Sequence, residues 1–166
     1  DLPKDGDKAI TSVRDLLAAD IQVALADPDQ AAIGRETRNL LAQIVDGETT
    51  LWDKLEKQVT DHGVMKTTVT EVANDVKIGA VDAGIVWDAT VAMPNFREDL
   101  TAVTTEELDG EPNLVSICVL NSSRNPTAAL KFARYLTSQD QGLPAFDKFG
   151  LRPVEGDVWA ERPEIR

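Results

Sequence analysis

The chain has 166 residues, of which 42% are hydrophobic and 28% charged, so it is long enough for one globular domain with its own core. Its net charge of -12, from 29 acidic and 17 basic residues, argues against nucleic acid or an anionic membrane as a partner. It contains one cysteine, which excludes an internal disulfide, and its longest apolar runs are too short to span a bilayer.

The first half of the chain alternates apolar runs typical of buried strands with amphipathic segments typical of helices. In chain order, the predicted elements are a helix at 12–19, a strand at 21–26, helices at 31–46 and 49–62, a strand at 64–67, a helix at 69–79 and a strand at 83–88. Gly47 is expected to end the helix at 31–46. Thr68 and Glu71 form a T-x-x-E capping box, which predicts a helix start at Val69.

The second half repeats this alternation. The predicted elements are strands at 100–104 and 114–120, a helix that Asn125 and Pro126 start, and a last helix that Ser138 and Gln141 cap and Gly150 closes. Cys118 lies inside the apolar run LVSICVL, so we expect it to be buried and inert. Strands that alternate with helices predict an α/β fold with a mostly parallel sheet and helices on both faces.

Two predicted helices begin directly after the carboxyl end of a strand, where open α/β sheets bind their ligands. The first backbone N–H groups of a helix have no helical acceptor and carry the positive end of the helix dipole, so they can bind an anion without a cationic side chain. Since every helix has such groups, an ordinary helix start remains the alternative on this pattern alone.

The sequence offers little catalytic chemistry. Its one histidine, His62, lies in a predicted loop, and no nucleophile elbow, zinc-protease, Walker A or dinucleotide-binding motif is present. We therefore expect no catalytic residue, no cofactor and no metal. An enzyme on an α/β scaffold is the less favoured alternative.

Three segments, ADPDQAAIG, TTVTEVANDVKIGAVDAGIVWDATVA and LVSICVLNSSRNPTAALKFARYLTSQDQGLPAFDKFG, resemble the molybdate-binding type of extracellular solute-binding protein that serves ABC transporters. The resemblance covers about Ile10 to Pro153. It implies a two-lobed, type II periplasmic-binding fold and a tetrahedral oxyanion such as molybdate or tungstate as ligand. It also implies a transporter permease as partner and a periplasmic or extracellular location, with a lipid anchor before trimming as one possibility.

Members of that family begin with a first lobe, so the resemblance implies a C-terminal fragment. The expected parts are a crossover at 1–8, the second lobe at 9–120, helices that return to the first lobe at 121–153, and a tail at 154–166. Apolar surface left by a missing lobe, above all around residues 126–150, favours self-association.

Carried over by position, the resemblance assigns ligand contacts to the backbone N–H of Ile33, beside Gly34, and to that of Val69, with Thr68 as a neighbouring hydroxyl donor. Trp87 stands where well-known members have a tyrosine whose hydroxyl contacts the ligand. Its indole N–H is a donor in a different place, so a different small anion stays open as the ligand, and Trp87 as a core residue stays open as well. The effector-sensing domain of a transcription regulator with the same fold is a further alternative.

Overall fold

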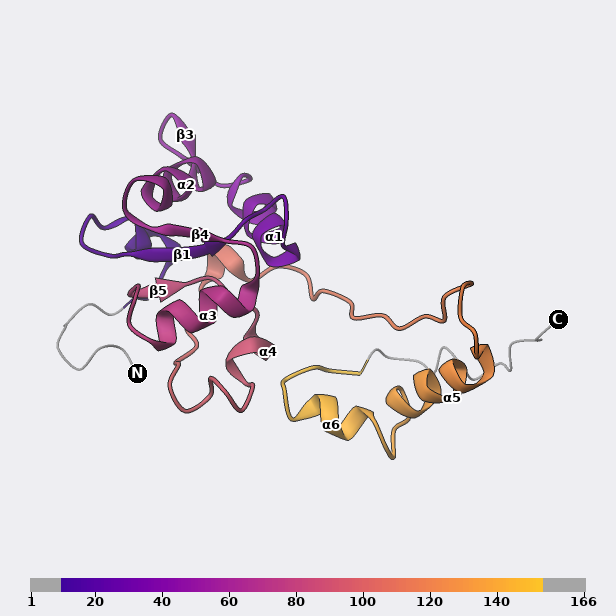
Figure 1. The fold of residues 1–166 in the computed structure, drawn as a ribbon. Coiled ribbons are helices and arrows are strands. Elements are labelled where there is room, and N and C mark those ends of the chain that lie inside the picture. The colour runs from indigo at the N-terminus through magenta and orange to yellow at the C-terminus, as the bar shows by residue number, and fades with distance from the viewer. Residues whose placement is uncertain (1–9, 154–166) are drawn as a thin grey trace. The chain divides into compact units, whose positions relative to one another are not determined.

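The computed structural model of the protein describes residues 10–153, and the chain falls into two units, Asp1–Asn113 and Leu114–Arg166. The elements of the first unit are η1 (Val13–Leu17), β1 (Val23–Ala26), α1 (Ala32–Leu41), β2 (Val45–Asp46), β3 (Thr49–Thr50), α2 (Leu51–His62), β4 (Val64–Lys66), α3 (Val69–Lys77), β5 (Ala83–Gly84), α4 (Asp88–Val91) and η2 (Glu106–Leu108). The second unit contains α5 (Pro126–Leu136) and α6 (Leu143–Asp147) (Figure 1). The crossover expected at 1–8 and the tail expected at 154–166 lie outside the described residues.

A three-stranded parallel sheet forms the centre of the first unit, with β1 between β4 and β5 (Figure 1). Ala24 of β1 pairs with Val64 on one side and with Gly84 on the other. All four residues of β1 are at most 2% exposed, and because successive side chains of a strand point to opposite faces, both faces of the sheet are covered. The α/β fold with a mostly parallel sheet is confirmed.

The helix starts follow the capping signals in the sequence. The hydroxyl of Thr68 accepts a hydrogen bond from the backbone N–H of Glu71, and α3 begins at Val69, as predicted. Thr50 caps α2 in the same way, and the side chain of Asn125 accepts from the backbone N–H of Ala128 at the start of α5. These bonds satisfy N–H groups that a helix leaves without acceptors.

The predicted helix at 31–46 is too long. It ends at Leu41, and the residues that follow form a hairpin of β2 and β3, in which Val45 pairs with Thr50. Gly47 has a φ of +78°, so it supplies the left-handed turn of the hairpin and does not end a helix. As a result, Val45 lies on the surface and not in the core.

Five other predictions about structure are wrong. Among the described residues, the segments at 100–104 and 114–120 pair with no strand, and the strand predicted at 83–88 stops at Gly84, with residues 85–87 in neither a strand nor a helix before α4 begins at Asp88. The last helix begins at Leu143, since the hydroxyl of Ser138 donates back to the carbonyl of Tyr135 and caps nothing. Without a paired strand around it, Cys118 is exposed.

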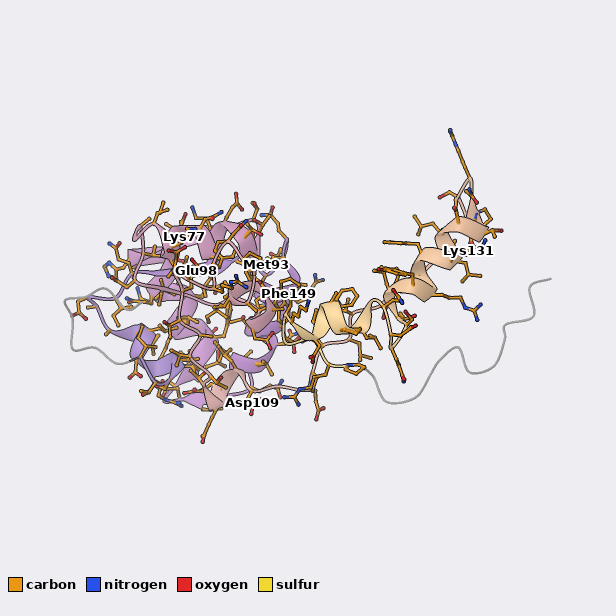
Figure 2. All side chains as sticks on the ribbon, turned by 90° about the horizontal axis from the view of Figure 1, so that it is seen from below. Lys77, Met93, Glu98, Asp109, Lys131 and Phe149 are labelled. Carbon is orange, nitrogen blue, oxygen red and sulfur yellow. The ribbon has the colours of Figure 1, made fainter. Side chains whose placement is uncertain are left out.

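Two contacts fix the loop after α4 to α3. The ammonium group of Lys77 donates to the backbone carbonyl of Asn95 at 2.8 Å and pairs with the carboxylate of Asp99 at 2.9 Å. Figure 2 labels Lys77 beside Met93 and Glu98, which belong to the same part of the first unit. These two contacts hold the loop against the last residue of α3.

Candidate functional site

The carboxyl edge of the parallel sheet brings the candidate residues together. β1 leads into α1, the neighbouring strand β4 leads into α3, and β5, on the other side of β1, leads to Trp87. The N–H of Asp27, just past β1, donates to the carbonyl of Lys66, the last residue of β4, at 2.7 Å. Because the strands are parallel and adjacent, α1 and α3 start at the same edge, as expected for a ligand site of an open sheet.

The first turn of α1 has no side-chain cap and no acidic residue. Its first helical hydrogen bond runs from the N–H of Arg35 to the carbonyl of Ala31 at 3.1 Å. The N–H groups of Ala32, Ile33 and Gly34 have no acceptor among the described residues. This helix start therefore presents three consecutive unpaired donors together with the positive end of a dipole.

Gly34 allows α1 to approach the end of β1 closely. A Cβ atom at this position would lie 2.2 Å from the carbonyl oxygen of Ala26 and 2.8 Å from the backbone nitrogen of Pro28. Both contacts are to backbone atoms, which cannot swing aside as a side chain can. Gly34 is thus needed for the position of the helix start, in addition to any contact of its own N–H group with a ligand.

The start of α3 differs from that of α1 because an acidic residue occupies it. Oε2 of Glu71 accepts hydrogen bonds from the hydroxyl of Thr67 at 2.7 Å and from the N–H and the hydroxyl of Thr68 at 2.9 Å each. The N–H groups of Val69 and Thr70 have no acceptor among the described residues. α3 therefore offers unpaired amides, but a carboxylate lies close to them, and the hydroxyl of Thr68 serves the cap.

Two carboxylates near the site are held in their charged form. Hydrogen bonds from Thr67 and then Thr68 lower the pKa of Glu71 below its ordinary value, and the N–H of Asp29 and then the side chain of Gln30 lower the pKa of Asp27. The guanidinium of Arg38 pairs with the carboxylate of Asp29 at 3.2 Å. The hydroxyls of Thr67 and Thr68 are thus engaged with Glu71, whereas the first amides of α1 and α3 have no acceptor among the described residues.

Trp87 is half-buried and packs against the core at the end of the segment after β5. It is the residue before the four-residue helix α4, and its carbonyl accepts a hydrogen bond from the N–H of Thr90 at 2.9 Å. Part of its ring therefore contributes to the core. The residue itself lies at the carboxyl edge of the sheet, where α1 and α3 also begin.

Among the described residues, no cluster of metal ligands lies at this edge, and a surface hollow of the first unit lies away from it. Within residues 10–153, no three histidine, cysteine or acidic side chains lie close enough together to hold a metal ion. A shallow hollow of about 260 Å³ is lined by Leu17 of η1 and by residues of α2, and it includes none of the candidate residues. Lys57 and Asp61 on its wall are paired with each other at 2.5 Å.

The comparison with protein families decides what kind of protein this is. The family model described as bacterial extracellular solute-binding protein matches residues 2–152. This chain belongs to that family. A comparison with curated proteins found no match, and neither did one with solved structures.

Membership sets the general function of this solute-binding protein. The family binds small solutes outside the cytoplasm, typically for a transporter, and its members are in general not enzymes. Across the described residues, none of the helices has the length and apolar composition needed to cross a membrane. The parallel sheet with covering helices is the α/β architecture that the family leads one to expect.

Sequence reasoning missed the role of two residues at the candidate site. Asp27 organises the turn into α1 by accepting from the N–H of Asp29 at 2.8 Å, which the Asp-Pro start of the turn could have indicated. Thr67 donates to Glu71 in addition to the ordinary capping box, and only a spacing of four residues hinted at this contact.

The predicted site residues differ in burial. Ile33 and Gly34 are buried, Val69 is half-buried and Thr68 is exposed.

Proposed function

We propose that this solute-binding protein binds a tetrahedral oxyanion of the molybdate or tungstate kind at the carboxyl edge of its sheet. The observation that supports this most is the pair of adjacent helix starts, α1 and α3, each with backbone N–H groups that have no acceptor among the described residues. Neutral, fixed donors suit a fully deprotonated oxyanion, because an anion that carries a proton also needs an acceptor.

In this proposal the two helix starts have unequal roles. The N–H groups of Ile33 and Gly34 bind the anion more strongly than those of α3, because the first turn of α1 contains no acidic residue. The N–H of Val69 contributes a weaker donor because of the carboxylate of Glu71. Thr68 orders the start of α3 through its cap, and the indole of Trp87 borders the site.

The proposed partner is the permease of an ABC transporter, which would receive the anion from the loaded protein. This follows from the resemblance described above and from the family, whose members typically serve a transporter. It predicts that anion binding precedes docking on the permease, so a variant without anion affinity should fail to support uptake.

The test is a thermal melt of the protein with molybdate, tungstate, sulfate or phosphate, compared with a melt without anion. A ligand at about 100 times its dissociation constant adds roughly 2.7 kcal/mol to the free energy of unfolding, which raises the melting temperature by about 5–11 °C for a chain of this size. A rise with molybdate and tungstate alone supports the proposal. A rise with sulfate or phosphate alone moves the ligand to a different anion, and no rise with any of them contradicts oxyanion binding by this chain.

A charge-altering pair of variants tests the site itself. Val69→Asp places a carboxylate among the amides of α3, whereas Val69→Asn loses the same packing without the charge. Binding should be lost in the first and largely kept in the second. Equal affinity in both variants would contradict the assignment of Val69.

A further inference from the structure

Arg35 is a cation without a partner near the start of α1. It is exposed, and its guanidinium forms no hydrogen bond or ion pair with any of the described residues. The other lysines and arginines between residues 10 and 113, Arg97 excepted, are each paired with a carboxylate. Within this part of the chain, the charge of Arg35 is therefore available to a ligand.

The usual direction of long side chains on a helix places this charge near the proposed donors. Such side chains lean toward the helix N-terminus, over the preceding turn. Arg38 does so here, since its guanidinium reaches Asp29, which precedes the helix. Arg35 lies three residues before Arg38, on the same side of α1. We therefore expect its guanidinium over the first turn, near the unpaired N–H groups of Ala32 and Ile33.

Carboxylates around the start of α1 repel an approaching anion. Asp27 and Asp29 lie in the turn before the helix, and Glu36 lies in its second turn. Arg38 and Arg35 are the cations on the same helix, so the loss of Arg35 leaves Arg38 alone against these acids. The net charge of -12 adds a repulsion of longer range. A cation beside the donors is thus needed most at this place.

We propose that Arg35 attracts the oxyanion to the start of α1 through solvent, while backbone N–H groups hold the bound anion. This inference rests on the proposed function, because it concerns the same anion at the same helix start. A charge that acts through solvent is screened by salt, and a lysine can replace it. A guanidinium in direct contact with the anion behaves differently, because a lysine does not reproduce its two parallel hydrogen bonds.

The expected size of the effect follows from Coulomb's law. A unit charge about 10 Å from a dianion in water changes the affinity by about fourfold without screening. At about 0.01 M salt the Debye length is about 30 Å, which leaves about threefold, and at about 0.15 M it is about 8 Å, which leaves about 1.5-fold. Arg35→Gln should therefore weaken binding by about threefold at low salt and hardly at all at physiological salt.

Arg97→Gln is the matched control. Arg97 is also an exposed arginine without an ion pair among the described residues, so its loss changes the net charge by the same amount. It lies between Asn95 and Asp99, which both contact Lys77, the last residue of α3. Because the proposed site includes the first residue of α3, Arg97 lies near the opposite end of that helix. Its loss should change the affinity by less than about twofold at either salt concentration.

Calorimetric titration of the 166-residue chain with molybdate, at about 0.01 M and about 0.15 M sodium chloride, tests the proposal. Arg35→Gln should show the salt-dependent loss given above, and Arg35→Lys should keep the affinity of the original chain. The melting temperature without ligand should stay the same in both variants, because Arg35 has no ion pair to lose.

Three results would overturn the role of Arg35 alone, since the original chain binds molybdate in all of them. They are an unchanged affinity of Arg35→Gln at low salt, an equal loss in Arg97→Gln, and a loss in Arg35→Lys as large as in Arg35→Gln. The last would identify a direct guanidinium contact. An original chain that does not bind molybdate at either salt concentration contradicts the proposed function, and this inference with it.

Discussion

Ala32→Asp should stabilise the fold and weaken oxyanion binding in the same molecule. Ala32 is the first residue of α1, it is exposed, and its N–H group has no acceptor among the described residues. The first turn of α1 contains no acidic side chain. A carboxylate there interacts favourably with the helix dipole by about 0.3–1 kcal/mol, which raises the melting temperature by about 1–4 °C for a chain of this size.

The same carboxylate opposes an anion bound at the N–H of Ile33. At a separation of about 5 Å, two unit charges repel by roughly 0.8 kcal/mol in a water-like environment and by roughly 3 kcal/mol near a protein surface. A dianion experiences about twice that energy, roughly 2–7 kcal/mol, so its affinity should fall by at least about tenfold. Ala32→Asp should thus raise the melting temperature and lower the anion affinity, whereas general damage to the fold would lower both.

The assay combines a thermal melt without ligand and calorimetric titration with molybdate and sulfate. Ala32→Asn has a similar shape without the charge and should keep most of the affinity. The reasoning is refuted if Ala32→Asp binds the anion as tightly as Ala32→Asn does, or if its melting temperature falls below that of the original chain.

Three further predictions follow from the same region. Gly34→Ala forces a Cβ against the carbonyl of Ala26 and should lower the free energy of unfolding by about 1–3 kcal/mol; an unchanged urea midpoint would disprove the close approach. Glu71 has a pKa below its ordinary 4.5, so its stabilising effect is present above that pH and is lost as the pH falls through the lower value in the folded chain. Glu71→Gln should therefore flatten the loss of stability in acid, and an equally steep loss would exclude this role. Trp87→Phe should keep the fold and remove any fluorescence change on anion binding; a change that persists would place the responding indole elsewhere.

Local signals in the sequence predicted the parts of the fold that local interactions decide. The capping box at Thr68 predicted the start of α3, and the buried run around Leu25 predicted the central strand. These signals act within three or four residues, so a single sequence contains all the information that they need. The parallel sheet followed because strands alternate with helices.

Signals that fit two structures were interpreted wrongly. Asp46 and Gly47 suit either the end of a helix or a tight hairpin turn, and pairing between Val45 and Thr50 decides for the hairpin. The apolar run at 114–120 has strong strand propensity, but a strand also requires a neighbour, which propensity does not reveal. At the candidate site, the helix starts were predictable, whereas the extra bond from Thr67 to Glu71 depends on side-chain geometry.

The sheet order β4-β1-β5 has a consequence for how the chain is made. β1 is the first strand of this sheet in the sequence, yet it lies in the middle of the sheet. The two residues that pair with Ala24, Val64 and Gly84, are therefore synthesised about 40 and 60 residues later. Strands so distant in sequence pair slowly, because the entropy of closing a long loop is lost before any favourable contact forms. During synthesis, β1 lacks a neighbour on one side until Ala83 and Gly84 have been made, and an apolar strand with an unpaired edge is the state that a chaperone or a protease would recognise.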